Sequence, residues 1–211
     1  MSGPVAQPAA KEELPLLGEE FAVEFANSLY RSPHEHLDFL ATPPAVRSWF
    51  SLAQPAAGLT LPREVSAELA RDLRSVRDAV RALLEHAAAV RGPARPPYGP
   101  ETATAVQTLH ASARRARAHL ILEASAGSEG PGWTLSHEGP LPDVLVAATA
   151  SRCILFLGGE DIGNVRICAR PGCPMLFVRR HRARRYCHES CGHNLRQARY
   201  YRARTVRTAA Q

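Results

Sequence analysis

The sequence predicts a mainly helical body with one small β-hairpin, an α+β arrangement, followed by a small cysteine-containing module that ends in a helix. Three observations support this prediction. Apolar residues recur at steps of three and four over residues 61–90, and two short apolar runs flank a glycine-rich loop at residues 125–132. Four of the five cysteines lie in the last 48 residues. With 211 residues, the chain is long enough to bury a core.

The first segments of the body are short. Residues 1–17 are rich in Pro and Ala, and we expect a flexible N-terminus. Phe21, Phe25 and Leu29 are spaced four apart, which predicts a helix. Breaks that contain proline then separate two further segments, residues 37–40 and 46–52.

The clearest helix runs from Leu61 to Val90, with Pro62 near its start. Its opposite face carries several acids and the bases Arg71, Arg74, Arg77 and Arg81. A second helix, from Glu101 to about Ala118, follows a loop rich in Pro and Gly, which predicts an antiparallel helix pair.

The next elements are a hairpin and an apolar helix. Residues 119–124 and 133–137 predict the two strands of a hairpin with a long loop. A helix over residues 143–157 opens after Pro142 and ends at Gly158-Gly159. Its nearly continuous apolar character indicates a buried core helix, in which Cys153 is a core thiol rather than a reactive one.

Composition excludes a membrane protein. No run of about 18 apolar residues is free of charge, and the N-terminus has neither a basic nor an apolar leader region. We expect a soluble cytoplasmic protein, associated with the nucleoid and without a membrane partner.

Charge divides the chain into two parts. Residues 1–163 carry a net charge of −5, whereas residues 164–211 contain 12 Arg and one acid and carry +11. We therefore expect a helical domain over residues 18–163 and a polyanion-binding module over residues 164–211. The alternative is a solvated basic tail without a partner.

The four cysteines of this module, Cys168, Cys173, Cys187 and Cys191, form a C-x4-C and a C-x3-C pair. Two close pairs joined by a short loop can place four thiolates around one Zn²⁺ ion, and such a closed shell indicates a structural rather than a catalytic metal. Disulfides and a redox-switched zinc site are the alternatives. His181, His188 and His193 are spare donors that we place outside the metal shell.

Two basic segments surround this site. The first is the loop between the second and third cysteines, and the second is a predicted helix after Cys191. Arginine pairs with phosphate oxygens and guanine edges, and tyrosine stacks on bases. The candidate nucleic-acid contacts are Arg179, Arg180, Arg182, Arg184, Arg185, His193, Asn194, Arg196, Arg199, Tyr200, Arg202 and Arg204. A solvated surface helix is the alternative for the second segment.

These residues resemble the CGNR zinc-finger family. The matching positions are Cys168, Cys173, Phe177, Arg184-Arg185-Tyr186-Cys187, Cys191-Gly192 and Tyr201-Arg202-Ala203-Arg204. The resemblance implies a treble-clef-like zinc finger that binds DNA. The family's Asn-Arg after Cys-Gly is replaced here by His193-Asn194, and Arg179 stands where many relatives have an acid.

The body resembles the ABATE domain that precedes this finger. Phe25-Ala-Asn-Ser-Leu, the segment from Leu37 to Pro43, and Trp49 carry the similarity. Together the two resemblances imply a bacterial stress-type transcriptional regulator.

The sequence is compatible with three functions. The first is a transcription factor in which zinc folds the finger, the finger binds duplex DNA, and the body senses a small-molecule effector or forms a homodimer. The second is an RNA-binding or ribosome-associated zinc module. The third is an enzymatic or ligand-binding body anchored by the finger. We expect no enzyme, because known catalytic motifs are absent and His34, His36, Glu24, Asp38 and His110 are isolated or poorly spaced.

Overall fold

The protein is described here by a computed structural model that covers residues 16–33, 35–57, 59–89, 101–123 and 132–193. The elements are α1 (Phe21–Asn27), β1 (Leu29–Arg31), β2 (His36–Asp38), α2 (Pro43–Ala57), α3 (Ala67–Ala89), α4 (Thr102–Ala113), β3 (Arg117–Glu123), β4 (Gly132–Glu138), α5 (Leu141–Leu157), a 3-10 turn (Glu160–Asn164), β5 (Val165–Ile167) and β6 (Leu176–Val178). The strands form three antiparallel pairs, β1–β2, β3–β4 and β5–β6. This mainly helical architecture confirms the predicted fold class.

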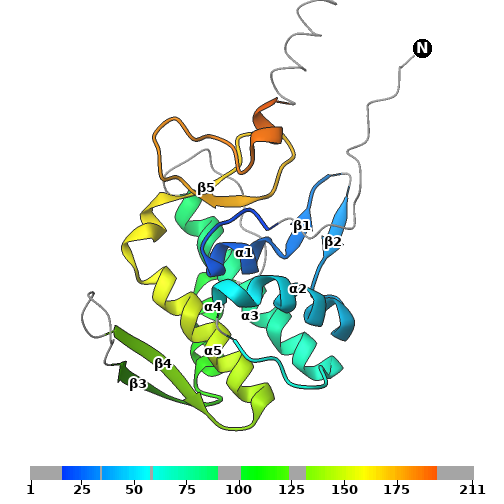
Figure 1. The fold of residues 1–211 in the computed structure, drawn as a ribbon. Coiled ribbons are helices and arrows are strands. Elements are labelled where there is room, and N and C mark those ends of the chain that lie inside the picture. The colour runs from blue at the N-terminus through cyan, green and yellow to red at the C-terminus, as the bar shows by residue number, and fades with distance from the viewer. Residues whose placement is uncertain (1–15, 34, 58, 90–100, 124–131, 194–211) are drawn as a thin grey trace, which may run out of the picture.

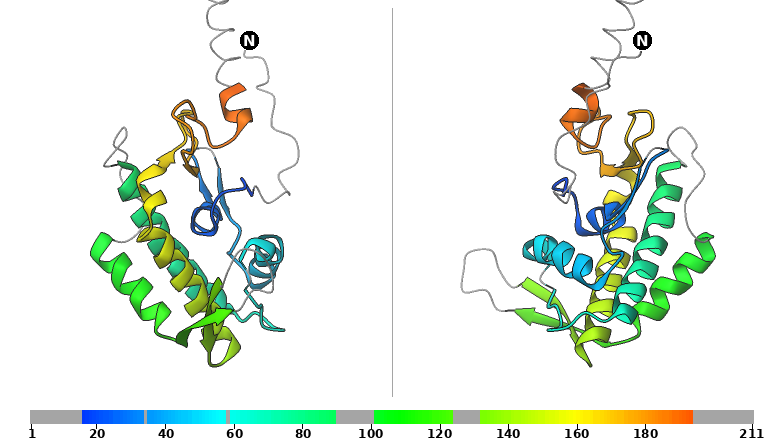
Figure 2. Two further views of the ribbon diagram at one scale, coloured as in Figure 1. Left: turned by 60° about the vertical axis from the view of Figure 1, so that its left-hand side comes forward. Right: turned by 90° about the vertical axis from the view of Figure 1, so that its right-hand side faces the viewer.

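The helices form one packed body. Helix α3 packs against α1, α4 and α5, and β5 also lies against α3 (Figure 1). The β5–β6 pair and the cysteine segment lie at one end of the molecule, whereas the β3–β4 hairpin lies at the other end (Figure 2).

An aromatic cluster joins α1 to α2. The rings of Phe21 and Phe25, one helical turn apart, are stacked with centroids 5.7 Å apart. Trp49 and Phe50 of α2 pack against Phe25 at 5.5 and 6.2 Å. All four side chains are buried, so the predicted apolar face of α1 is confirmed. Leu29, expected on the same helical face, lies in β1 instead.

Two predicted helix boundaries are wrong for local reasons. Helix α3 begins at Ala67 rather than Leu61, because Ser66 Oγ accepts a hydrogen bond from the Leu69 amide and caps the first turn. Helix α4 ends at Ala113 rather than near Ala118, because the chain enters β3 at Arg117.

Helix α3 also buries two bases from the face expected to be polar. Arg77 and Arg81 are 2% and 1% exposed. The Arg77 guanidinium pairs with Asp38 and Asp78, and Arg81 pairs with Glu85 at 2.8 Å. These ion pairs compensate the cost of burying the two guanidinium groups. The apolar periodicity of α3 did not predict that burial.

Helix α5 is the predicted apolar core helix. It runs to Leu157 and ends at Gly158, as expected. Cys153 is fully buried in it, and burial raises the pKa of this thiol, which confirms a core role. Within the described part of the chain, every helix is too short or too polar to span a bilayer.

Candidate metal centre and nucleic-acid interface

The β5–β6 hairpin positions the first cysteine pair. Cys168 directly follows β5, and Cys173 lies just before β6. The turn between them closes through a hydrogen bond from the Cys173 amide to the Arg170 carbonyl at 3.1 Å. Gly172 adopts φ +77°, a left-handed conformation that favours glycine. A bond from the Cys168 amide to the Met175 carbonyl at 2.9 Å extends the strand ladder to the site.

The second cysteine pair lies at the start of a helical turn. Residues 189–193 are helical, and the Cys191 amide bonds to the His188 carbonyl at 3.1 Å. The Ala169 amide donates to the Arg185 carbonyl at 2.9 Å, which ties the loop to the first turn. Both pairs therefore face one point.

The four thiols fit a tetrahedral metal site. Their Sγ atoms all lie within 4.8 Å of one another. The Cys173–Cys187 and Cys187–Cys191 separations are 3.8 and 3.6 Å. Tetrahedral Zn²⁺ with Zn–S bonds of about 2.3 Å requires S–S distances of about 3.8 Å. All four cysteines are free, so the disulfide alternative is not the state that this structure describes.

Electrostatics at the site also suit a cation. Hydrogen bonds among the thiols, first that with Cys173, lower the pKa of Cys168, whereas the bond with Cys168 raises the pKa of Cys187. Four adjacent thiols cannot all ionise without a compensating charge, and a bound Zn²⁺ supplies that charge. Arg170 Nη1 adds one donor, 3.8 Å from Cys191 Sγ. Four thiolates close the coordination shell, so the metal's chemistry here is structural cross-linking.

Strand β6 connects this site to the body. Met175 and Phe177 pack into the cysteine cluster, together with Leu17 before α1, Tyr30 of β1 and Tyr186. Leu176 and Val178 point the other way, into the main core. Successive side chains of a strand face opposite sides, so one short strand belongs to both cores.

Asn27, at the end of α1, holds β6 by its main chain. Its side-chain amide donates to the Leu176 carbonyl and accepts from the Leu176 amide, both at 2.9 Å. Arg81 adds a bond from Nη2 to the Pro174 carbonyl at 2.8 Å. Sequence reasoning assigned no role to these two residues. The signal for Asn27 was its place in Phe25-Ala-Asn, the motif that carries the ABATE resemblance.

Two loop arginines are bound to the body. Arg180 forms an ion pair with Glu20 at 2.9 Å, and Arg184 forms one with Glu19 at 2.5 Å. Arg184 also donates to the Val178 and Cys187 carbonyls and lies over the Phe177 ring. In this structure Arg184 supports the finger through these contacts.

The remaining loop bases face solvent to different degrees. Arg182 and Arg185 are exposed, and Arg179 is half-buried. Within the described residues, the side chains of Arg182 and Arg185 form no hydrogen bond or ion pair. His193 is exposed at the end of the helical turn. Six predicted contacts lie outside the described residues: Asn194, Arg196, Arg199, Tyr200, Arg202 and Arg204.

The other titratable candidates do not assemble into a site. Glu24 is buried and accepts the Leu17 and Glu19 amides, Asp38 pairs with Arg77, and His110 is exposed on α4. His34 lies outside the described residues. Within the described part, the four cysteines are the one group of three or more donors close enough to hold a metal ion.

The fold and the site define a mainly helical body joined to a four-cysteine module of the zinc-finger type. Residues 19–160 match the ABATE family model, described as "Putative stress-induced transcription regulator", and residues 164–204 match the CGNR zinc finger model. The ABATE match covers more than half of the chain, so the protein belongs to the ABATE family and carries a CGNR zinc finger. No curated protein matches the chain.

These matches, together with the thiol cluster, establish Zn²⁺ as the cofactor and a zinc-finger regulator as the general class. The matched families are regulator and zinc-finger families, not enzyme families.

Proposed function

We propose that this protein is a cytoplasmic, non-catalytic transcriptional regulator whose zinc finger binds duplex DNA. Cys168, Cys173, Cys187 and Cys191 hold the Zn²⁺ that orders the finger, and exposed arginines of the finger contact DNA phosphates. The body, as one domain over residues 18–163, senses an effector or mediates dimerisation.

The observation that carries this proposal is the free basic surface beside the metal site. Arg182 and Arg185 are exposed and unpaired within the described residues. Next to them lies a hollow of about 800 Å³, whose lining includes His181, Arg185, Tyr186 and His188. Glu189 is the one acid in that lining. Donors arranged around an open hollow suit the oxygens of a phosphate backbone.

Charge supports the same partner. The module carries 12 Arg against one acid, and two of these arginines are neutralised by Glu19 and Glu20. The surplus positive charge favours a polyanion over an acidic peptide, because each phosphate contact releases counterions. In this proposal the predicted contact residues after the helical turn also bind DNA: Asn194, Arg196, Arg199, Tyr200, Arg202 and Arg204.

Selection from genomic DNA fragments by the zinc-loaded protein, at near-physiological salt and with total RNA as competitor, tests the proposal. We expect enrichment of duplex fragments that share a sequence motif and loss of this enrichment in Cys187→Ser. Binding that RNA abolishes, or binding without a shared motif, would contradict a DNA-specific regulator and favour the RNA-binding alternative.

A salt titration of Arg185→Ala tests the proposed contact surface. If Arg185 contacts phosphate, the variant weakens binding and reduces the slope of log K against log salt by about one unit. Arg71→Ala, which removes an exposed arginine from α3, is the matched control and should leave the slope unchanged. An equal effect of both substitutions would show that only net charge matters.

A further inference from the structure

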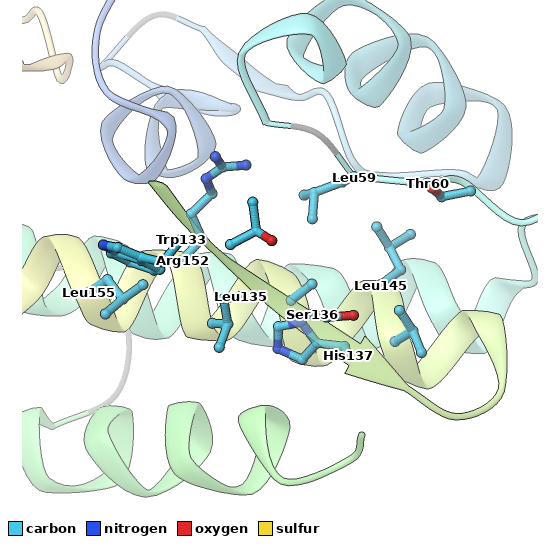
Figure 3. Close-up of a pocket in the computed structure, with 12 residues that line it drawn as sticks. Leu59, Thr60, Trp133, Leu135, Ser136, His137, Leu145, Arg152 and Leu155 are labelled. Carbon is cyan, nitrogen blue, oxygen red and sulfur yellow. The ribbon is translucent and has the colours of Figure 1, made fainter. Parts of the chain in front are cut away.

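A cavity of about 520 Å³ lies between strand β4, one side of α5, and Leu59 and Thr60 before α3 (Figure 3). This volume falls within the range of about 300–1,000 Å³ that small-molecule sites occupy. The cavity lies in the helical body, on elements other than the β5–β6 pair that positions the cysteines. Sequence reasoning had no signal for it, because its walls come from three separate parts of the chain.

The walls are largely apolar. Leu59 and Leu145 are buried at the inner side, and Ala148 continues this surface along α5. Trp133 and Leu155 are 61% and 53% exposed, so a large aromatic and a large aliphatic side chain are left open to solvent. Large apolar groups left open around a concave site are typical of ligand pockets rather than of a plain surface.

One cation lies among these walls. Arg152 lines the cavity, and Figure 3 places it at one end with Leu145 at the other. Its guanidinium lies 5.9 Å from the centroid of the Phe21 ring, and within the described residues no carboxylate pairs with it. None of the described lining residues is acidic. Arg152 is therefore available to an anionic group at this end.

A polar contact between β4 and α5 holds the cavity walls together and adds no second charge to the cavity. His137 Nε2 lies 3.1 Å from Ser151 Oγ, which holds β4 against α5. Burial, with a smaller effect of His119, lowers the pKa of His137, so this imidazole is neutral near pH 7. The cavity thus has one positive end at Arg152 and largely apolar walls, and the His137–Ser151 contact holds its β4 wall in place.

We propose that this cavity binds a small amphipathic carboxylate, with its carboxylate on Arg152 and its apolar part against Leu145 and Leu59. The proposal deepens the effector-sensing role of the body proposed above. Its test measures binding to the protein without nucleic acid, so this site and the DNA-binding function can fail independently.

The test uses 4-phenylbutyrate and its uncharged counterpart 4-phenylbutyramide as probes. Trp133 lines the cavity and Trp49 is buried in the core, so quenching of tryptophan emission reports occupancy, and calorimetry gives the affinity. We expect the carboxylate to bind about tenfold more tightly than the amide, because a charge-assisted hydrogen bond to Arg152 is formed only with the carboxylate.

Two variants and one control make the test decisive. Arg152→Gln should weaken the carboxylate about tenfold and leave the amide unchanged, whereas Ala148→Trp should fill the cavity and abolish both. Arg71→Gln removes one exposed charge elsewhere and should change neither affinity. Helical circular dichroism confirms that each variant is folded. Equal affinities of the two probes, unaltered binding in Arg152→Gln, or no saturable binding would overturn the proposal.

Discussion

Arg81 places a positive charge at a position that is 1% exposed, and each of its three side-chain nitrogens donates a hydrogen bond there. Nε bonds to Glu85, Nη1 to the Ala26 and Leu29 carbonyls, and Nη2 to the Pro174 carbonyl. Desolvation lowers the pKa of this guanidinium, and the Glu85 charge opposes that effect. One side chain therefore joins α3, α1 and the residues before β6.

Replacing Arg81 with Met should destabilise the fold strongly. The variant removes the Arg81 partner of Glu85, which is 4% exposed, together with the side-chain donor to the Ala26, Leu29 and Pro174 carbonyls, at a cost of about 3–5 kcal/mol. Urea unfolding followed by circular dichroism measures this change. The double variant Arg81→Met/Glu85→Leu should recover part of the loss, since it also removes the buried Glu85 carboxylate. A single variant as stable as the parent would contradict the assigned role.

Glu24 makes the protein less stable as pH rises, which is the reverse of the usual effect of a carboxyl group. Burial raises its pKa from the ordinary 4.5 to about 6, although the Glu19 and Leu17 amides donate to it. The folded state therefore binds more protons than the unfolded chain between these values. The carboxyl's contribution to the free energy of unfolding is thus present below pH 4.5 and is lost as pH rises through 6.

Glu24→Gln tests this pH dependence. The difference in unfolding free energy between the parent and the variant should shift by about 2 kcal/mol from acidic to neutral pH, in favour of the variant at neutral pH. Urea unfolding of both proteins across this range measures it, and the comparison cancels the pH dependence of zinc binding. A constant difference would show that Glu24 titrates normally.

At the scale of elements, sequence patterns located the apolar helices and the hairpin but not the contacts between distant segments. The apolar run of α5 and its Gly158 end are local signals, and the structure confirms them. Asn27 and Leu176 are 149 residues apart, so no periodicity could pair them. The burial of Arg77 and Arg81 on α3 was missed for the same reason, because the groups that pair with them include Asp38 and Pro174, far along the chain.

The cysteine site shows the opposite case. Its ligands lie within 24 residues and their spacing alone brings the four thiols together, so the sequence was enough to predict the cluster. The basic loop was harder. Composition gave five equivalent arginines, whereas the structure separates Arg180 and Arg184, which pair with Glu20 and Glu19, from the exposed Arg182 and Arg185.

Asn27→Ala should loosen β6 without disturbing the helices. Loss of the two hydrogen bonds leaves the buried Leu176 amide and carbonyl unsatisfied, at a cost of about 2–3 kcal/mol. Hydrogen exchange at the Leu176 amide should accelerate, and a chelator should remove zinc faster. Asn164→Ala, at an exposed position, is the control and should change neither rate. Unchanged exchange in Asn27→Ala would mean that α1 does not anchor the strand.

At the scale of the whole molecule, loss of one cysteine should affect zinc binding but not the helix content. Cys187→Ser should release zinc and unfold the C-terminal segment, while helical circular dichroism stays nearly intact, because the α1, α3 and α5 core contains none of the four thiols. Zinc stoichiometry and far-ultraviolet dichroism measure the two effects. Cys153→Ser, a buried thiol outside the cluster, should retain one zinc per chain. Full metal content in Cys187→Ser would refute the four-cysteine assignment.

Strand β6 limits how freely this finger can be exchanged between proteins. Its two sides contact different parts of the molecule: Phe177, with Met175 just before the strand, packs against the cysteines, and Leu176 and Val178 pack against the helices. A finger cut at residue 164 and fused to an unrelated carrier would present Leu176 and Val178 to water and lose the amide of Asn27. A finger moved to another protein therefore needs α1 with it. Hybrids that join finger and body from different relatives should express well only when they keep Asn27 and when the helices that cover Leu176 and Val178 come from the same parent as β6.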